Sequence, residues 1–182
     1  LWQVENEPFI NFTFGECAMF NSGSIAKEVA LVRQLDPTRK IVMTDSGEPS
    51  TWREAAKMSD IFGTTLYRTI RISDSFTWKY DWLPPAAYKF RAWIWGKNPQ
   101  TFFVSELQAE PWFSASPVSG NIDFTDTTTF TPQRFDENVA YAKKVGASRS
   151  YLWGAEWWYY MKTKQNNTEY WTKAGELFQQ EN

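Results

Sequence analysis

Short apolar runs alternate along this chain with segments whose apolar residues recur every three or four positions. The short runs are typical of buried strands, and the three-to-four spacing is typical of helices with one buried face. Regular alternation of the two predicts βα units around a parallel sheet. Five strands are expected, at residues 1–6, 40–44, 61–67, 101–105 and 150–153.

Five helices fit between and after these strands. They are expected to begin at Ser22 or Ser24, at Thr51, at Pro84–Pro85, near Pro132 and at Thr168. A serine should cap the first helix, and Thr51 with Glu54 three residues later should form a capping box for the second. The inward faces expected for the third and last helices are Phe90, Trp93 and Ile94, and Trp171, Ala174, Leu177 and Phe178.

Two glutamates follow apolar strands at a separation that matches a whole number of βα units. Glu7 follows the first strand, Glu106 follows the fourth, and they lie 99 residues apart, which is three steps of 33. A βαβ unit takes roughly 30 residues or more, so the spacing predicts two carboxylates on the same face, three strands apart around a barrel. They should face each other across its mouth.

Two carboxyl groups about 5 Å apart suit retaining glycoside hydrolysis, in which one is the nucleophile and the other a general acid and then base. Repulsion and burial would raise the pKa of one carboxyl so that it holds a proton near neutrality. A single strand-end glutamate is more simply a solvated charge. Asp45 and Glu48, after the second strand, are either ordinary surface acids or ligands of distal sugar hydroxyls.

The composition excludes several kinds of catalytic and metal site. The chain has no histidine and one cysteine, which excludes a Ser-His-Asp triad, a Cys-His pair and an imidazole- or thiolate-held metal. No metal and no cofactor are therefore expected. A net charge of −2 argues against nucleic acid as a partner. No apolar run of about eighteen residues is present to span a membrane.

The chain is rich in aromatic residues, with 11 Trp, 8 Tyr and 14 Phe, many beside acidic or amide residues. Most should fill the core, but the mixture also suits a carbohydrate, whose C–H face stacks on indole while its hydroxyls need polar partners. Residues 72–83 carry alternate aromatics that predict either a small edge strand or a stacking surface. The long Ser-, Thr- and Pro-rich stretch 111–131 is typical of a functional loop.

Two motifs resemble a known group. Trp-Gln-Val-Glu-Asn-Glu-Pro at 2–8 resembles the fourth-strand acid/base motif of the clan A retaining glycoside hydrolases, TIM barrels that include cellulases, β-mannanases and β-galactosidases. Phe-Phe-Val-Ser-Glu-Leu-Gln at 102–108 resembles their seventh-strand nucleophile segment. The resemblance implies an α/β fold, a (β/α)8 barrel, of which this chain covers strands four to eight.

The same resemblance implies roles for individual residues. Glu7 would be the acid/base, Glu106 the nucleophile, and Asn6 the partner of the substrate 2-hydroxyl. Tyr67 would hydrogen-bond the nucleophile, although Thr65 stands where many members have histidine. Trp153 would be the indole platform under the sugar. Substrate contacts are also expected from Glu156 and Trp112. Glu110 competes with Glu106 as nucleophile, but Glu106 is preferred because it directly ends the apolar strand, whereas Glu110 lies four residues on, in the loop.

The expected function is hydrolysis of β-linked glycosides or polysaccharides by double displacement, without a choice among glucan, mannan and galactoside. Residues 1–182 would be the carboxyl-terminal portion of one catalytic barrel. The absent strands one to three would be needed to close the barrel, so the isolated chain should be inactive and prone to self-association. Localisation is left open.

Two other classes of protein remain. A noncatalytic carbohydrate-binding protein would also expose aromatics, but it would not require paired glutamates at this spacing. A doubly wound α/β binding protein would place its ligand where the strand order reverses, and the sequence lacks the glycine-rich loop that such proteins use for phosphates.

Overall fold

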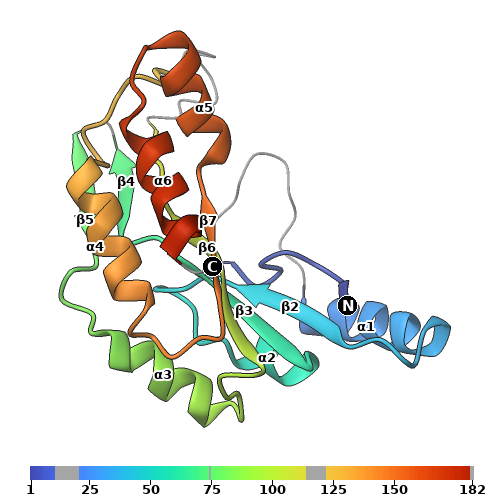
Figure 1. Cartoon of the computed structure of the whole chain (residues 1–182). Coiled ribbons are helices and arrows are strands. Elements are labelled where there is room, and N and C mark those ends of the chain that lie inside the picture. Colours follow the sequence, from blue (N-terminus) through green and yellow to red (C-terminus); the bar gives the residue numbers. More distant parts are fainter. Residues whose placement is uncertain (11–20, 74, 114–121, 181–182) are drawn as a thin grey trace.

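A computed structural model of the chain describes residues 1–10, 21–73, 75–113 and 122–180 (Figure 1). Its main sheet has five parallel strands in the order β1-β2-β3-β6-β7. Their bounds are Trp2–Gln3 for β1, Ile41–Asp45 for β2, Ile61–Leu66 for β3, Phe102–Gln108 for β6 and Ser150–Trp153 for β7. All five expected strands are present, and the mixed α/β class is confirmed.

The six helices of the described residues are α1 (Ser22–Leu35), α2 (Arg53–Met58), α3 (Pro85–Ile94), α4 (Pro132–Ala142), α5 (Ala155–Lys164) and α6 (Glu169–Gln180). Figure 1 shows α1 and α2 beside the β2 and β3 part of the sheet, and α4, α5 and α6 grouped beside β6 and β7. Helix α5 was not expected from the sequence. It follows β7 directly, after the single residue Gly154.

The predicted helix caps were wrong. Asn21 caps α1, because its side chain accepts a hydrogen bond from the Ser24 backbone N–H at 2.9 Å. Helix α2 has no side-chain cap and starts after Trp52, whose φ of 64° is left-handed. The Trp52 ring is fully buried and its indole donates to the Ser46 carbonyl at 3.0 Å. Burial of this indole therefore set the start of α2 in place of a capping box.

The core behind the sheet is aromatic. Trp52 contacts Phe62, Tyr88 and Phe102 at ring-centroid distances of 5.2, 5.5 and 5.6 Å, and all four side chains are buried. A second cluster, built around Phe130 and rings from α4, α5 and α6, lies at the β7 side.

The predicted inward face of α3 was wrong. Phe90 and Trp93 are 60% and 69% exposed and stack on each other, and Ile94 is exposed as well. The buried face of α3 is Tyr88 and Ala92, which lie four residues apart on one side of the helix.

In α6 the buried residues are Tyr170 and Ala174, with Leu177 partly buried, whereas Trp171 and Phe178 are exposed. The prediction is therefore confirmed for Ala174 and Leu177 and wrong for Trp171 and Phe178. Tyr170 takes the inward place because its ring packs on Trp157 at 4.5 Å and on Phe130 at 6.0 Å.

The aromatic stretch after β3 forms a separate antiparallel hairpin of β4 (Thr69–Ser73) and β5 (Phe76–Lys79). The small-strand alternative is thus confirmed for part of this stretch. Successive rings of Phe76, Trp78, Tyr80 and Trp82 contact each other at 6.2 to 6.5 Å. Three of these four rings are exposed, so the stacking-surface alternative stays a prediction.

Within the described residues, β1 and β7 each have one strand neighbour and form the two edges of the sheet. Large apolar side chains lie exposed at these edges, namely Leu1, Trp2, Tyr151 and Trp153. The sheet therefore has the form of an open half-barrel. No helix in the described part of the chain is both long and apolar enough to cross a membrane.

Candidate active site

The carboxyl ends of β1, β2, β3 and β6 bring polar side chains together. Thr44 on β2 and Thr65 on β3 lie between the two glutamates that the sequence singled out, and each bonds to the Glu7 region. Thr65 is also the register partner of Glu106, where a bulge in the β3–β6 pairing skips Ser105. Neighbouring strands lie about 4.8 Å apart, so Glu106 stands beside the threonine that bonds Glu7.

Glu7 lies in a turn beyond β1, four residues after the strand ends. Its φ of 47° is in the left-handed region. Two bonds hold it there: its backbone N–H donates to Thr44 Oγ1 at 3.0 Å, and Thr65 Oγ1 donates to its Oε1 at 3.0 Å. A strained backbone conformation fixed by neighbours is common at functional sites.

The environment of Glu7 favours its protonated form. Burial raises the pKa of this carboxyl, and the negative charge of Glu106 raises it further. The hydrogen bond from Thr65 lowers it, and together these effects raise the pKa of Glu7 to about 7. Asp45 and Glu48 add smaller repulsions. A carboxyl with this pKa can donate a proton and later accept one near neutral pH.

Glu106 is held by a different partner. Tyr67 donates its hydroxyl to Glu106 Oε2 at 2.9 Å. Burial and the charge of Glu106 raise the pKa of the Tyr67 hydroxyl, and the charges of Glu110 and Glu7 add to this. The phenol therefore stays protonated and is a permanent donor to the Glu106 carboxylate.

Two further expected residues flank this group. Asn6 is exposed, and its Oδ1 accepts from Thr44 Oγ1 at 2.8 Å and from Gln3 Nε2 at 3.1 Å. Trp112 packs edge-on against the Tyr67 ring at 5.3 Å. The structure thus brings Asn6, Glu7, Tyr67, Glu106 and Trp112 into one continuous set of contacts.

The remaining expected residues form an adjoining group at the end of β7. Trp153 is 50% exposed, and its side chain hydrogen-bonds Glu110. Glu156 lies in the first turn of α5 and is exposed. Burial raises the pKa of Glu110 to about 7, the bond from Trp153 opposes this, and the charge of Glu156 adds to it.

Gly154 allows these two strand ends to approach. Its φ is 142°, and a Cβ at this position would lie 2.8 Å from the Ala109 carbonyl oxygen. The Ala109 N–H also bonds the Trp153 carbonyl at 2.9 Å. A side chain larger than hydrogen would push Trp153 away from Glu110.

Glu106 does not end its strand, as the sequence had suggested. Strand β6 continues to Gln108, so Glu106 lies inside it and Glu110 lies two residues beyond it. The bonds that extend β6 come from β7, where Leu107 and Gln108 pair with Leu152 and Trp153. The two candidates still differ, since only Glu106 bonds Tyr67.

Asp45 and Glu48 are engaged by the protein itself. Asp45 is buried and accepts from Ser50 Oγ at 2.6 Å and from the Ser46 N–H at 2.8 Å. Glu48 accepts from Tyr88 Oη at 2.6 Å and from the Tyr67 N–H at 3.4 Å. Both carboxylates thus support the loop after β2, and Glu48 also supports the backbone of Tyr67.

The sequence did not reveal the supporting threonines. Thr65 was noted only as the position where many members of the resembled group have histidine, and Thr44 was simply the last residue of an expected strand. Both lie at the carboxyl ends of neighbouring strands, which is a usable signal once the strand order is known. Among the described residues, no three His, Cys, Asp or Glu side chains gather as metal ligands.

A comparison of this chain with protein-family models found no match, and a comparison with curated proteins found no significant match.

Proposed function

We propose that the chain forms the last five βα units of a (β/α)8 barrel, and that this barrel is a retaining glycoside hydrolase of the clan A type. Its substrates would be β-linked glycosides or polysaccharides. One observation carries the proposal: a glutamate with a pKa of about 7 and a second glutamate bonded to a partly buried tyrosine flank the same strand residue, Thr65.

The two glutamates suit the two steps of double displacement. In the first step a Glu106 oxygen attacks the anomeric carbon while protonated Glu7 gives its proton to the departing glycosidic oxygen. In the second step Glu7, now a carboxylate, takes a proton from water as the water attacks the same carbon and Glu106 leaves. Glu7 recovers its proton, and the product keeps the configuration of the substrate.

The other site residues suit substrate binding. Asn6, exposed beside Glu7, would bond the 2-hydroxyl, and the Tyr67 hydroxyl would orient the nucleophile. Trp153 would lie under the sugar ring, and Trp112 would limit the position of the Tyr67 ring and contact the substrate. Glu156, in the first turn of α5, would accept bonds from sugar hydroxyls. A carbohydrate substrate and no cofactor follow from this assignment.

Closure of the barrel requires further strands. The edges at β1 and β7 and the exposed apolar side chains on them favour pairing with additional βα units. We therefore place three more strands between these edges. The residues described here would carry both carboxylates, while part of the sugar pocket would come from those strands.

The proposal is tested by hydrolysis of an aryl β-glycoside by the full-length protein. Wild type should release the phenol and give the β-anomer of the sugar first, as observed by NMR. Glu106→Gln should abolish hydrolysis while sugar binding by calorimetry persists. Glu176→Gln, an exposed glutamate on α6, is the matched control and should keep full activity. Unchanged hydrolysis by Glu106→Gln, or the α-anomer as first product, would reject the assignment.

A noncatalytic carbohydrate-binding protein is the second candidate. It is favoured by the exposed rings of Trp78, Trp82 and Trp153. This candidate predicts that wild type binds β-linked oligosaccharides and releases no product during long incubation. It also predicts that Glu106→Gln leaves the dissociation constant unchanged.

A further inference from the structure

The chain leaves the main sheet directly after β3, and a side chain then takes the place of a strand partner. The last register pair of β3 and β6 is Leu66 with Leu107. Thr69 lies three residues after Leu66, and Gln108 directly follows Leu107. The Thr69 N–H donates to Gln108 Oε1 at 3.0 Å, and Gln108 Nε2 donates to the Thr69 carbonyl at 2.7 Å. The Gln108 amide thus replaces the peptide group that a neighbouring strand would supply.

This pair of bonds is isolated from water. Thr69 and Gln108 are 0% and 1% exposed. The backbone carbonyl of Gln108 accepts from Asn138 Nδ2 at 2.9 Å, which ties β6 to α4. Buried amides of this kind are costly to leave unpaired, so the pairing has one strongly favoured geometry.

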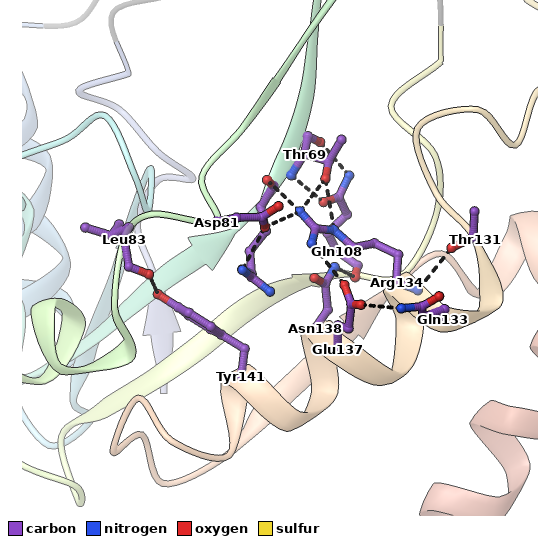
Figure 2. A network of polar contacts seen from close by, with 11 residues as sticks. Thr69, Asp81, Leu83, Gln108, Thr131, Gln133, Arg134, Glu137, Asn138 and Tyr141 are labelled. Carbon is purple, nitrogen blue, oxygen red and sulfur yellow. Dashed lines mark hydrogen bonds and ion pairs between the residues drawn. The ribbon is translucent and has the colours of Figure 1, made fainter.

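The side chain of Thr69 takes part in a second set of polar contacts, with Arg134 and, through it, Asp81 (Figure 2). Arg134 on α4 donates to Thr69 Oγ1 at 2.9 Å and to Asp81 Oδ1 at 2.6 Å. Arg68 donates to the same Asp81 oxygen at 2.8 Å. Figure 2 shows Arg134 pointing from α4 toward Thr69 and Asp81, with Gln108 beside them.

Tyr67 lies between these two fixed points. Leu66 before it is paired with β6, and Thr69 after it is paired with the Gln108 side chain, so both ends of a four-residue segment are attached to the strand that carries Glu106. The Tyr67 hydroxyl reaches that same strand at Glu106 Oε2. The segment 66–69 is thus joined to β6 at three points: at Leu66, at the Tyr67 hydroxyl and at Thr69.

We propose that Gln108 is a positioning residue, which sets the Tyr67 hydroxyl on the Glu106 carboxylate through its two bonds to the Thr69 backbone. The inference rests on the proposed function, because Glu106 is the nucleophile there. Displacements of about 1 Å in an active site cost up to roughly a hundredfold in rate. A polar side chain buried in the strand that carries the nucleophile is therefore useful for catalysis, beyond satisfying two backbone groups.

The kinetic test compares Gln108→Met, Tyr67→Phe and the double variant in the full-length protein. Methionine has a similar volume and cannot make either bond. Gln108→Met should lower kcat roughly tenfold with KM changed by less than about threefold. The double variant should be no slower than Tyr67→Phe, since both changes remove the same bond. If the fold-losses in kcat of the two single variants multiply in the double variant, the inference is overturned.

Lys97→Met is the matched control. Lys97 Nζ donates to the Ser59 carbonyl at 2.6 Å, which is also a side-chain bond to backbone, but at the opposite end of β3. This variant should lose a similar amount of stability and keep the wild-type kcat. A fall in kcat equal to that of Gln108→Met would show that lost stability alone explains the effect.

A second readout does not depend on hydrolysis. The hydroxyl proton of Tyr67, shielded and bonded to a carboxylate, should give a slowly exchanging NMR signal that Tyr67→Phe removes. Gln108→Met should broaden or shift this signal, and Gln108→Glu, which keeps the acceptor for the Thr69 N–H, should have a smaller effect. An unchanged signal in both variants would overturn the inference. If wild type is inactive while Gln108→Met moves the signal, the proposed function fails and the positioning role stands.

Discussion

Glu7 and Glu106 have the same type of side chain but lie in two different kinds of backbone structure. Glu106 lies inside the seven-residue strand β6, with paired strands on both sides. Glu7 lies in a turn after the two-residue strand β1, with a left-handed backbone and one edge of the sheet beside it. Their partners differ as well, because Glu106 accepts from the Tyr67 phenol and Glu7 from the Thr65 hydroxyl.

Under the proposed function, this difference would give two identical side chains different chemical roles. A nucleophile has to meet one carbon atom in line, so a central strand and a tyrosine that stays protonated suit it. An acid/base has to bind and release a proton, so partial burial next to a second negative charge suits it.

The two glutamine variants should respond differently to the leaving group. With a poor leaving group, both Glu7→Gln and Glu106→Gln should slow hydrolysis by about a thousandfold or more. With a highly acidic phenol as leaving group, Glu7→Gln should form the glycosyl-enzyme rapidly and give a burst of phenol, because no proton is needed for departure. Glu106→Gln should show no burst. Stopped-flow absorbance measures this, and a burst from Glu106→Gln alone would exchange the two assignments.

The stability of the chain should depend on the charge of Glu7. Its folded-state pKa of about 7 lies above its ordinary value of 4.5, so the folded state binds the proton more tightly. The free energy of unfolding should therefore fall as pH rises from about 4.5 to 7. Glu7→Gln should unfold in urea with about 1–3 kcal/mol more stability than wild type at pH 8, and with little difference at pH 4. A constant difference at both pH values would contradict the raised pKa.

Thr65→Val should move the pKa of Glu7 upward. The bond from Thr65 favours the charged carboxylate, so its loss leaves burial and the charge of Glu106 less opposed. The alkaline limb of the kcat/KM profile should shift to higher pH, while the acidic limb stays in place. The Gly47 N–H also loses its acceptor at Thr65 Oγ1, at a cost of about 1 kcal/mol of stability. A downward shift of the alkaline limb would disprove the role of this bond.

Glu110→Gln should have the smallest effect. The pKa of Glu110 is also about 7, but it arises from burial and the charge of Glu156, and Glu110 lies beyond the strand without a bond from Tyr67. Hydrolysis should stay within about threefold of wild type, with the pH profile unchanged. A loss as deep as that of Glu106→Gln would transfer the nucleophile role to Glu110.

The strands and the candidate carboxylates were predictable, whereas several contacts around them were not. Parallel strands buried on both faces give continuous apolar runs, such as Ile41–Val42–Met43, and these are visible in the sequence. Helix α5 was hidden because its Trp and Tyr residues show little helical periodicity. The buried face of α3, and half of the buried face predicted for α6, were misjudged because aromatic residues occur on both faces of each helix.

The sequence by itself determined the five parallel strands, the order of polar residues after them, and the presence of two glutamates three βα steps apart. Those properties are local, or follow from the regular length of a βα unit. The Tyr67–Glu106 bond was expected only from the resemblance, and the structure contains it. Only the tertiary structure decided that Thr65 lies between the glutamates and that the Gln108 side chain replaces a strand partner for Thr69. Such contacts join residues 39 or more positions apart, and a bulge in one strand sets their register, so no local pattern encodes them.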